Sequence, residues 1–304
     1  MIFLITILAV IVVLFLLHTL FNMEYYPMDE EARKEASGAF VNLSHGATHY
    51  HIYGSENKET VVLIYGISLP SYSWNDFATQ LANNGLKVIT YDLYGRGYSE
   101  RPYTIYNGRL YIRQLQELLD ALHVTEKVSI LGISMGGGIA NHFASHHPER
   151  VKKIVLLTPL HTSNILATLF TTPPLGELML TILAARKMIA IQNETAKELD
   201  LPAGWSAPYR RQMEFFGYRR AIISSIREFA TENHVESFKK IAALKMPVLL
   251  IWGKDDKVIP FSGHKSVMAN IPHAQFLPLD NTGHLIHLEE LEIVTKNVVE
   301  FLRD

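Results

Sequence analysis

A serine lies at the centre of a glycine-rich segment, Gly132-Ile133-Ser134-Met135-Gly136, that joins two contrasting stretches of chain. Residues 128–131 have the character of a buried strand, and residues 139–147 that of a helix. A serine on such a tight turn takes a strained backbone conformation that raises its hydroxyl above the sheet, beside N–H groups at the start of the helix. The pattern indicates a serine nucleophile with an adjacent site for an oxyanion.

A serine hydroxyl needs a base to accept its proton and a carboxylate to orient that base. His284 follows the last predicted strand, residues 275–279, and precedes the last predicted helix. Asp255 and Asp256 both follow another predicted strand, residues 247–252. By chain order, either aspartate could complete a serine–aspartate–histidine triad at the carboxyl edge of a sheet.

The elements that would position these side chains alternate along the chain. Helical patterns separate strand-like runs at 61–65, 87–91, 128–131, 153–157, 247–252 and 275–279. This alternation is typical of an α/β protein with a mostly parallel, doubly wound sheet. Runs at 40–43 and 49–53 have no helix between them and predict an antiparallel hairpin. Residues 161–246 contain no strand-like run and predict a helical insertion, with helices over 175–191 and 209–229.

From about residue 38 the chain resembles the α/β-hydrolases that carry a helical cap. The motifs are Tyr65-Gly66-Ile67-Ser68, Asp92-Leu93-Tyr94-Gly95-Arg96-Gly97-Tyr98-Ser99, the serine turn, and Trp252-Gly253-x-x-Asp256 with Gly283-His284. The resemblance implies a catalytic triad of Ser134, Asp256 and His284, with Asp256 preferred to Asp255. It also implies oxyanion donors at the backbone N–H groups of Ile67 and Met135. The family usually has histidine where this chain has Tyr65.

Further candidate contacts to a substrate lie in the first motif and in the predicted cap. Gly66 and Ser68 flank the Ile67 donor. The apolar side chains of Met179 and Leu183 would contribute to a wall for an acyl chain, or would only pack the cap onto the core.

The first 21 residues contain no Asp, Glu, Lys or Arg, and as a helix they would span about 30 Å, the thickness of a bilayer core. They predict an uncleaved membrane anchor, with a signal peptide or a buried helix as alternatives. Arg33 and Lys34 follow the run and favour a cytoplasmic catalytic domain. The predicted organisation is an anchor (1–23), a stalk (24–38), a core (39–160 and 247–304) and a cap (161–246).

Composition excludes several kinds of protein. A net charge of −2 argues against nucleic acid as the main partner, and the lack of cysteine excludes a thiol nucleophile. His49 and His51 lie on one face of a predicted strand. They could be a pair of metal ligands, or they could belong to an ordinary polar strand face. Paired arginines in the cap, Arg210-Arg211 and Arg219-Arg220, could form a solvated face or contact anionic headgroups.

Together these features predict a single-pass membrane serine hydrolase that acts on a lipophilic carboxylic ester, as monoacylglycerol lipases and carboxylesterases do. No metal or organic cofactor and no obligate protein partner are expected; the expected partners are a small ester and the bilayer. A serine aminopeptidase, with Glu194, Glu198 or Asp200 binding the amine, remains an alternative of the same fold. A carbon–carbon bond hydrolase for small acidic ring-cleavage products is another, and a non-catalytic membrane receptor or scaffold is a third.

Overall fold

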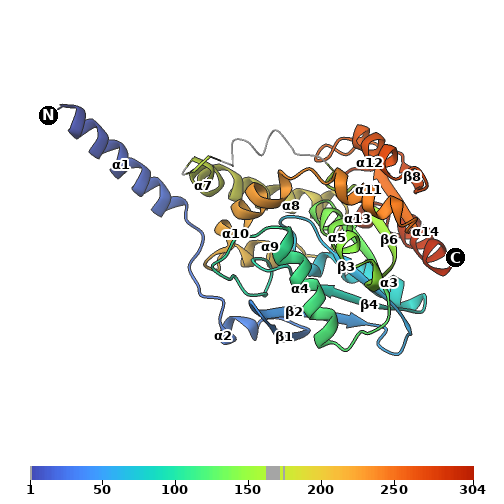
Figure 1. The fold of residues 1–304 in the computed structure, drawn as a ribbon. Helices are drawn as coiled ribbons and strands as arrows, with labels where there is room; N and C mark the ends of the chain where they lie inside the picture. Colours follow the sequence, from blue (N-terminus) through green and yellow to red (C-terminus); the bar gives the residue numbers. More distant parts are fainter. Residues whose placement is uncertain (1, 162–171, 174) are drawn as a thin grey trace.

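The computed structural model describes residues 2–161, 172–173 and 175–304 (Figure 1). Its centre is an eight-stranded sheet with the order β1-β2-β4-β3-β5-β6-β7-β8. The strands are β1 (Ala39–Leu43), β2 (Gly46–Tyr53), β3 (Glu59–Ile64), β4 (Leu86–Tyr91), β5 (Val128–Ile133), β6 (Val151–Leu157), β7 (Val248–Gly253) and β8 (Gln275–Leu279). β2 is antiparallel to β1 and β4, and the other neighbours are parallel, which confirms the predicted sheet and hairpin.

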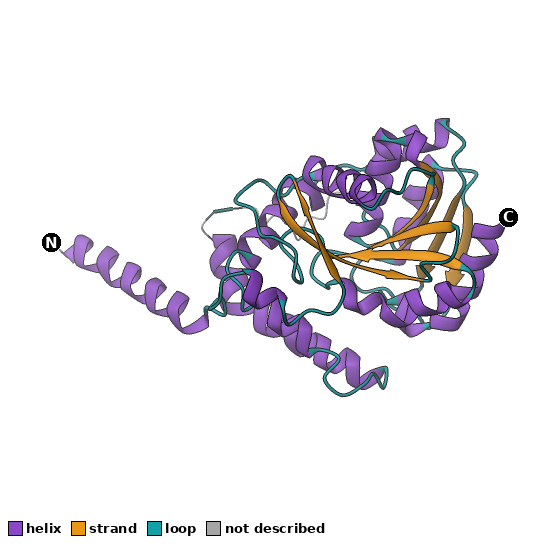
Figure 2. Cartoon of the chain, turned by 90° about the horizontal axis from the view of Figure 1, so that it is seen from below, coloured by secondary structure: helices purple, strands orange, loops and turns teal. Residues whose placement is uncertain are grey.

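Helices cover both faces of this sheet, so its central strands are buried on both sides (Figure 2). The core helices are α3 (Asn75–Asn83), α4 (Gly108–Ala121), α5 (Met135–His146), α11 (Val235–Ala243), α12 (His264–Asn270), α13 (Ile286–Glu289) and α14 (Leu291–Arg303). Alternate residues of one strand enter different cores: Val62 packs with the side chains of α4 and α5, and Val61 with those of α3 and α14.

The insertion between β6 and β7 is helical in its described part. It contains α7 (Leu175–Met179), a π-helical turn (Leu180–Ala184), α8 (Ala185–Glu198), α9 (Ala207–Gln212), α10 (Tyr218–Ser225) and a second π-helical turn (Ile226–Ala230). α11 falls within the predicted cap range, but it packs against α5 and α12 and so lies with the core helices. The start of the predicted cap, residues 162–171, lies outside the described residues.

The predicted single helix over 209–229 is wrong. The chain leaves the helix after Gln212 and starts another at Tyr218. Gly217 adopts a left-handed conformation (φ 91°), which a residue with a side chain disfavours and which ends any continuous helix here. Just before it, Phe215 pairs in a parallel β-bridge with Tyr26, so a segment distant in sequence occupies the break.

The N-terminal helix α1 (Ile2–Phe21) projects away from the sheet (Figure 1). Within the described chain, its segment Phe3–Phe21 is the one helix long and apolar enough to cross a membrane, judged by length and composition. None of that segment is buried against the rest of the molecule. Its last turn nevertheless meets the cap, because Arg186 of α8 lies over the ring of Phe21 at 4.6 Å.

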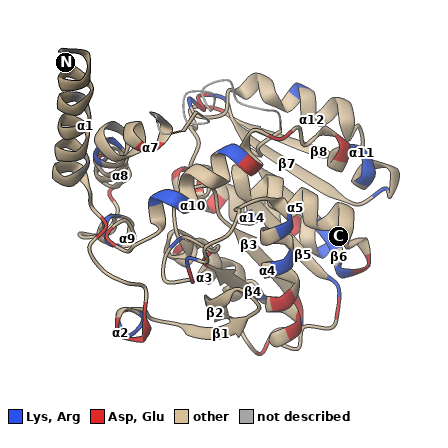
Figure 3. Cartoon of the chain, turned by 60° about the vertical axis from the view of Figure 1, so that its left-hand side comes forward, with Lys and Arg blue, Asp and Glu red and all other residues tan. Residues whose placement is uncertain are grey.

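The segment predicted as a stalk is docked on the cap rather than free. We call residues 24–35 the N-terminal strap; it includes the short helix α2 (Glu30–Arg33). The Glu24 carboxylate accepts hydrogen bonds from the N–H groups of Gly217 and Arg219 at the start of α10. Further along the strap, Glu35 binds Arg211 through both carboxylate oxygens, at 2.8 and 2.6 Å. In Figure 3, charged residues are marked on the ribbons of α2, α9 and α10.

The cap arginines are thus mostly used inside the molecule. Arg211 and Arg219 pair with Glu35 and Glu24 of the strap. Arg220 donates to the carbonyls of Pro102 and Arg101. These contacts account for three of the four arginines; the side chain of Arg210 is largely exposed and lies 3.6 Å from Glu214.

Candidate active site

Ser134 occupies the strained turn that the sequence predicts. It lies between β5 and α5 with φ 56° and ψ −122°, a conformation unfavourable for a residue with a side chain. Gly136 allows the turn to close, because a Cβ there would lie 2.2 Å from the carbonyl oxygen of Ile64. The Ser134 carbonyl accepts from the N–H groups of Gly137 and Leu160, which fixes the backbone. The side chain is therefore held at the carboxyl end of a central strand.

The structure brings His284 and Asp256 together from two neighbouring loops. His284 Nδ1 lies 2.8 Å from Asp256 Oδ2, and the Asp256 side chain is fully buried. The other carboxylate oxygen accepts from the N–H groups of Val258 and Ile259. Asp255, the alternative acid, is exposed, and no hydrogen bond or ion pair joins it to the imidazole. The carboxylate is thus fixed on one side and available to orient the histidine on the other.

Ser134 and His284 line one cavity of about 540 Å³. The cavity wall also includes Gly66, Ile67 and Ser68, from the loop after β3. Gly66 lies very close to the nucleophile candidate, because a Cβ added there would be 3.5 Å from Ser134 Oγ. Because Met135 is the first residue of α5, its N–H is at the positive end of the helix dipole. Ile67, Ser134 and His284 therefore line the same cavity, with Asp256 behind His284, whereas Met135 is not part of the lining. Within the described chain, no hydrogen bond joins the Ser134 hydroxyl to the imidazole.

The loop that carries Ile67 is held in place by Arg96 of the glycine-rich motif and by Gln212, which the sequence did not single out. Arg96 donates from Nε to the Ile67 carbonyl at 2.9 Å, and it is almost fully buried. Gln212 of the cap donates to the Ser68 carbonyl at 2.7 Å and accepts from Gly97. Because the carbonyls of Ile67 and Ser68 are both hydrogen-bonded, the peptide units of the loop cannot rotate freely, and the directions of their N–H groups are restricted.

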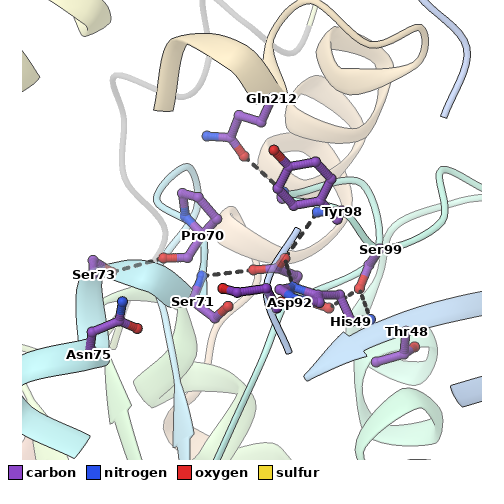
Figure 4. A network of polar contacts seen from close by, with 12 residues as sticks. Thr48, His49, Pro70, Ser71, Ser73, Asn75, Asp92, Tyr98, Ser99 and Gln212 are labelled. Carbon is purple, nitrogen blue, oxygen red and sulfur yellow. Dashed lines mark hydrogen bonds and ion pairs between the residues drawn. The ribbon is translucent and has the colours of Figure 1, made fainter. Parts of the chain in front are cut away.

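A buried ion pair supports the same loop from behind (Figure 4). Asp92 Oδ1 accepts from the Ser71 N–H at 2.7 Å, and Oδ2 lies 2.7 Å from His49 Nδ1. Burial alone would lower the pKa of His49, but the Asp92 carboxylate raises it above its usual value. Burial would raise the pKa of Asp92, but the His49 charge and the N–H groups of Ser71 and Tyr98 hold it below its usual value. Both directions favour an imidazolium–carboxylate pair.

The suggestion that His49 and His51 bind a metal is not supported. His49 uses both ring nitrogens, one toward Asp92 and one toward the Ser37 carbonyl. Across the described residues, no group of three or more His, Cys, Asp or Glu side chains is placed to hold a metal ion. Asp92 and Ser99 belong to the glycine-rich motif of the resemblance, and that motif was the available signal for this network.

Glu289 is a further residue that the sequence did not reveal. Its two carboxylate oxygens accept from the N–H groups of Gly283 and Leu285, the residues on either side of His284. Glu289 also lines the cavity. One carboxylate therefore fixes the backbone on both sides of the candidate base.

The structure corrects one of the two predicted cap contacts. Met179 is not part of the lining of the Ser134 cavity, and the side chain of Leu183 lies outside the described residues. The cap lines this cavity instead through one face of α8: Ile191, Gln192, Thr195, Glu198 and Leu199. The earlier part of this helical stretch faces α1, where Leu180 and Met188 line a small separate pocket with Phe21. Of the acids considered for binding an amine, Glu198 lines the cavity, and Glu194 and Asp200 do not.

Comparisons with known proteins agree with the observed fold. Residues 59–291 match the family described as "alpha/beta hydrolase fold". A 2-hydroxy-6-oxononadienedioate/2-hydroxy-6-oxononatrienedioate hydrolase from Paraburkholderia phymatum is 28% identical over 88% of this chain and 96% of its own. A solved meta-cleavage product hydrolase from Pseudomonas fluorescens is 25% identical, with a TM-score of 0.64 over 88% of this chain and 97% of its own.

The enol-lactonase from Burkholderia xenovorans has the same fold, with a TM-score of 0.72 over 88% of this chain and 100% of its own, at 21% identity. Because the family match covers most of the sequence and the sheet, turn and cap are those expected, the chain belongs to the α/β-hydrolase fold family.

Proposed function

We propose that the chain is a serine hydrolase in which Ser134 attacks a substrate carbonyl. The observation that supports this most is the Asp256–His284 contact beside the cavity that Ser134 lines. His284 accepts the serine proton as the Oγ–carbonyl bond forms, and the N–H groups of Ile67 and Met135 stabilise the oxyanion. His284 then donates that proton to the leaving group as its bond to the carbonyl carbon breaks. Water, deprotonated by His284, releases the acyl group from Ser134.

For the bond that is broken, we propose a carbon–carbon bond next to a ketone. The relatives named 2-hydroxy-6-oxononadienedioate/2-hydroxy-6-oxononatrienedioate hydrolase support cleavage of a carbon–carbon bond better than cleavage of a lipid ester. They are 28% identical to this chain and match nearly all of it. Those names describe 6-oxo acids, and hydrolysis next to a ketone can break only a carbon–carbon bond. In such a reaction the proton from His284 goes to the leaving carbon, whose negative charge must be delocalised.

Ester hydrolysis is a second candidate, favoured by the charge of the cavity. Among the described residues that line it, Lys257 is the one lysine or arginine, whereas Glu198, Asp255 and Glu289 are acidic. A doubly charged dioate would meet more repulsion here than a neutral ester would. The apolar helix α1 also suits a lipophilic substrate. We propose that α1 anchors the chain in a bilayer with the hydrolase domain on the cytoplasmic side.

The test uses the purified full-length chain and its Ser134→Ala variant. A fluorophosphonate probe should label the wild type and not the variant; equal labelling would exclude Ser134 as the nucleophile. The substrates are a 2-hydroxy-6-oxo-dienedioate, a monoacid analogue with a phenyl ketone, and octanoate esters. Faster turnover of either oxo acid than of any ester would support carbon–carbon cleavage, and the reverse order would support the ester candidate. Activity should fall about 10⁴-fold or more in Ser134→Ala.

A further inference from the structure

Within the described chain, two enclosed polar side chains that line the Ser134 cavity have no hydrogen-bond partner, Tyr65 from the core and Gln192 from the cap. Gln192 lies on α8, lines the cavity and is only 8% exposed. Within the described chain, its enclosed Oε1 accepts no hydrogen bond and its Nε2 donates none. Buried amides in proteins are nearly always hydrogen-bonded, because losing water without a replacement partner costs free energy. An unpartnered amide at this position therefore indicates a ligand that supplies the missing bonds.

A second polar group lies beside it on the same helix face. Thr195 is three residues further along α8, so the two side chains are neighbours on the helix surface. Thr195 also lines the cavity, and its hydroxyl makes no hydrogen bond to the described chain. Ile191 and Leu199 complete this face with apolar surface. The cap thus presents Gln192 and Thr195 between the apolar Ile191 and Leu199, with Glu198 at one end of this face.

The charge around Gln192 and Thr195 selects the kind of group that they can bind. An amide and a hydroxyl can each donate and accept, which matches a substrate hydroxyl. Glu198, three residues beyond Thr195, also lines the cavity, and its negative charge disfavours a carboxylate close by. We propose that Gln192 and Thr195 form a subsite for a hydroxyl group of the substrate. This proposal rests on the proposed function, since it assigns part of the substrate of that site.

Both candidate reactions supply such a hydroxyl. The names of the relatives include a 2-hydroxy group, and a monoacylglycerol carries free glycerol hydroxyls. The shared chemistry is a hydroxyl on the part of the substrate that departs from the acyl group. A simple alkyl ester or a deoxy oxo acid lacks it. Each pair therefore isolates the contribution of the hydroxyl within one class of substrate.

The experiment measures binding in a Ser134→Ala background, where turnover does not interfere. Monooctanoylglycerol is compared with propyl octanoate, and a 2-hydroxy-6-oxo-6-phenyl dienoate with its 2-deoxy analogue, by calorimetric titration. The hydroxylated member of at least one pair should bind about tenfold tighter, the effect of one good hydrogen bond. Gln192→Met, which keeps the length of the side chain, should abolish the difference. Glu194→Gln, at an exposed position of α8 outside the cavity lining, should preserve it.

Several outcomes would overturn the subsite. These are equal binding within both pairs, or a preference that persists in Gln192→Met while that variant melts like the parent. If Gln192→Met does not fold, Thr195→Val takes its place and should reduce the preference. If the deoxy acid gains most from Gln192, the subsite binds carboxylate and the hydroxyl assignment fails. Lack of turnover by the intact chain would refute the proposed function alone, because the binding ratios do not depend on it.

Discussion

The contact between Glu289 and the loop of His284 makes a quantitative prediction. In Glu289→Ala the N–H groups of Gly283 and Leu285 lose their acceptor. Hydrogen bonds to a charged group contribute about 1.5–3 kcal/mol each, and this half-exposed site should lie at the lower end. The loop should therefore lose about 3 kcal/mol of its restraint, enough to populate displaced positions of the imidazole. Because a shift of about 1 Å can cost about 100-fold, we expect a loss of that size in kcat with little change in KM.

The rate of fluorophosphonate labelling is the suitable assay, because it reports the reactivity of Ser134 without knowledge of the substrate. Glu289→Gln keeps one acceptor oxygen and should be intermediate, about tenfold slower than the wild type. Glu290→Ala is the matched control, since that neighbouring side chain makes no hydrogen bond or ion pair within the described chain. If folded Glu289→Ala labels as fast as Glu290→Ala, the carboxylate only stabilises the fold and the reasoning is refuted.

Two further predictions concern stability. Burial among aromatic rings lowers the pKa of His287 to about 3, so the folded chain keeps it neutral while the unfolded chain protonates it below about pH 6.5. Stability is therefore lost as pH falls, and between pH 7 and 5 the wild type should lose about 2 kcal/mol more than His287→Leu in urea unfolding; equal losses would contradict the assignment. Deleting residues 1–38 should lower the unfolding free energy by about 1–3 kcal/mol relative to deleting residues 1–23, which spares Glu24. Equal urea midpoints for the two truncations would show that the strap is not part of the folded domain.

The parts of the site that the sequence predicts are those set by local structure. A glycine two positions before and after Ser134 allows the tight turn, and the strand before it places the turn at the carboxyl edge of the sheet. The same reasoning places His284 and Asp256 at that edge, because each follows a strand of the parallel sheet. Chain order alone left Asp255 and Asp256 open; the motif position favoured Asp256, and the hydrogen bond to His284 agrees with it.

The cap residues that line the cavity were harder to predict, because apolar residues lie on several sides of the cap helices. The stretch 175–191 offers many apolar residues, so periodicity does not say which face meets the cavity. The π-helical turn at Leu180–Ala184 changes which side of the helix the following residues lie on, and the apolar pattern of the sequence does not predict such a turn. Met179, which was expected in the wall, is not part of the cavity lining, whereas Gln192 on the later helix α8 is.

Contacts between distant segments explain the remaining differences. The break between α9 and α10 depends on Glu24, which lies 193 residues before Gly217 in the sequence. The periodicity of residues 209–229 indicates only a helix, because Glu24, which stabilises the break, lies outside this segment. The sequence of the strap alone is typical of a polar stalk, because the partners of Glu24 and Glu35 are arginines of the folded cap.

The strap also connects, through adjacent residues, to the candidate oxyanion loop. Glu35 binds Arg211, and the next residue, Gln212, donates to the Ser68 carbonyl beside Ile67. The loop is thus fixed from the core by Arg96 and from the cap by Gln212. Gln212 is the last residue of α9, and the strap restrains that end of the helix through Arg211. A change in how the strap sits on the cap would therefore reach the loop through a single peptide unit. On this argument, the loss of the strap should slow labelling of Ser134 in molecules that remain folded, an effect that a purely tethering segment would not have.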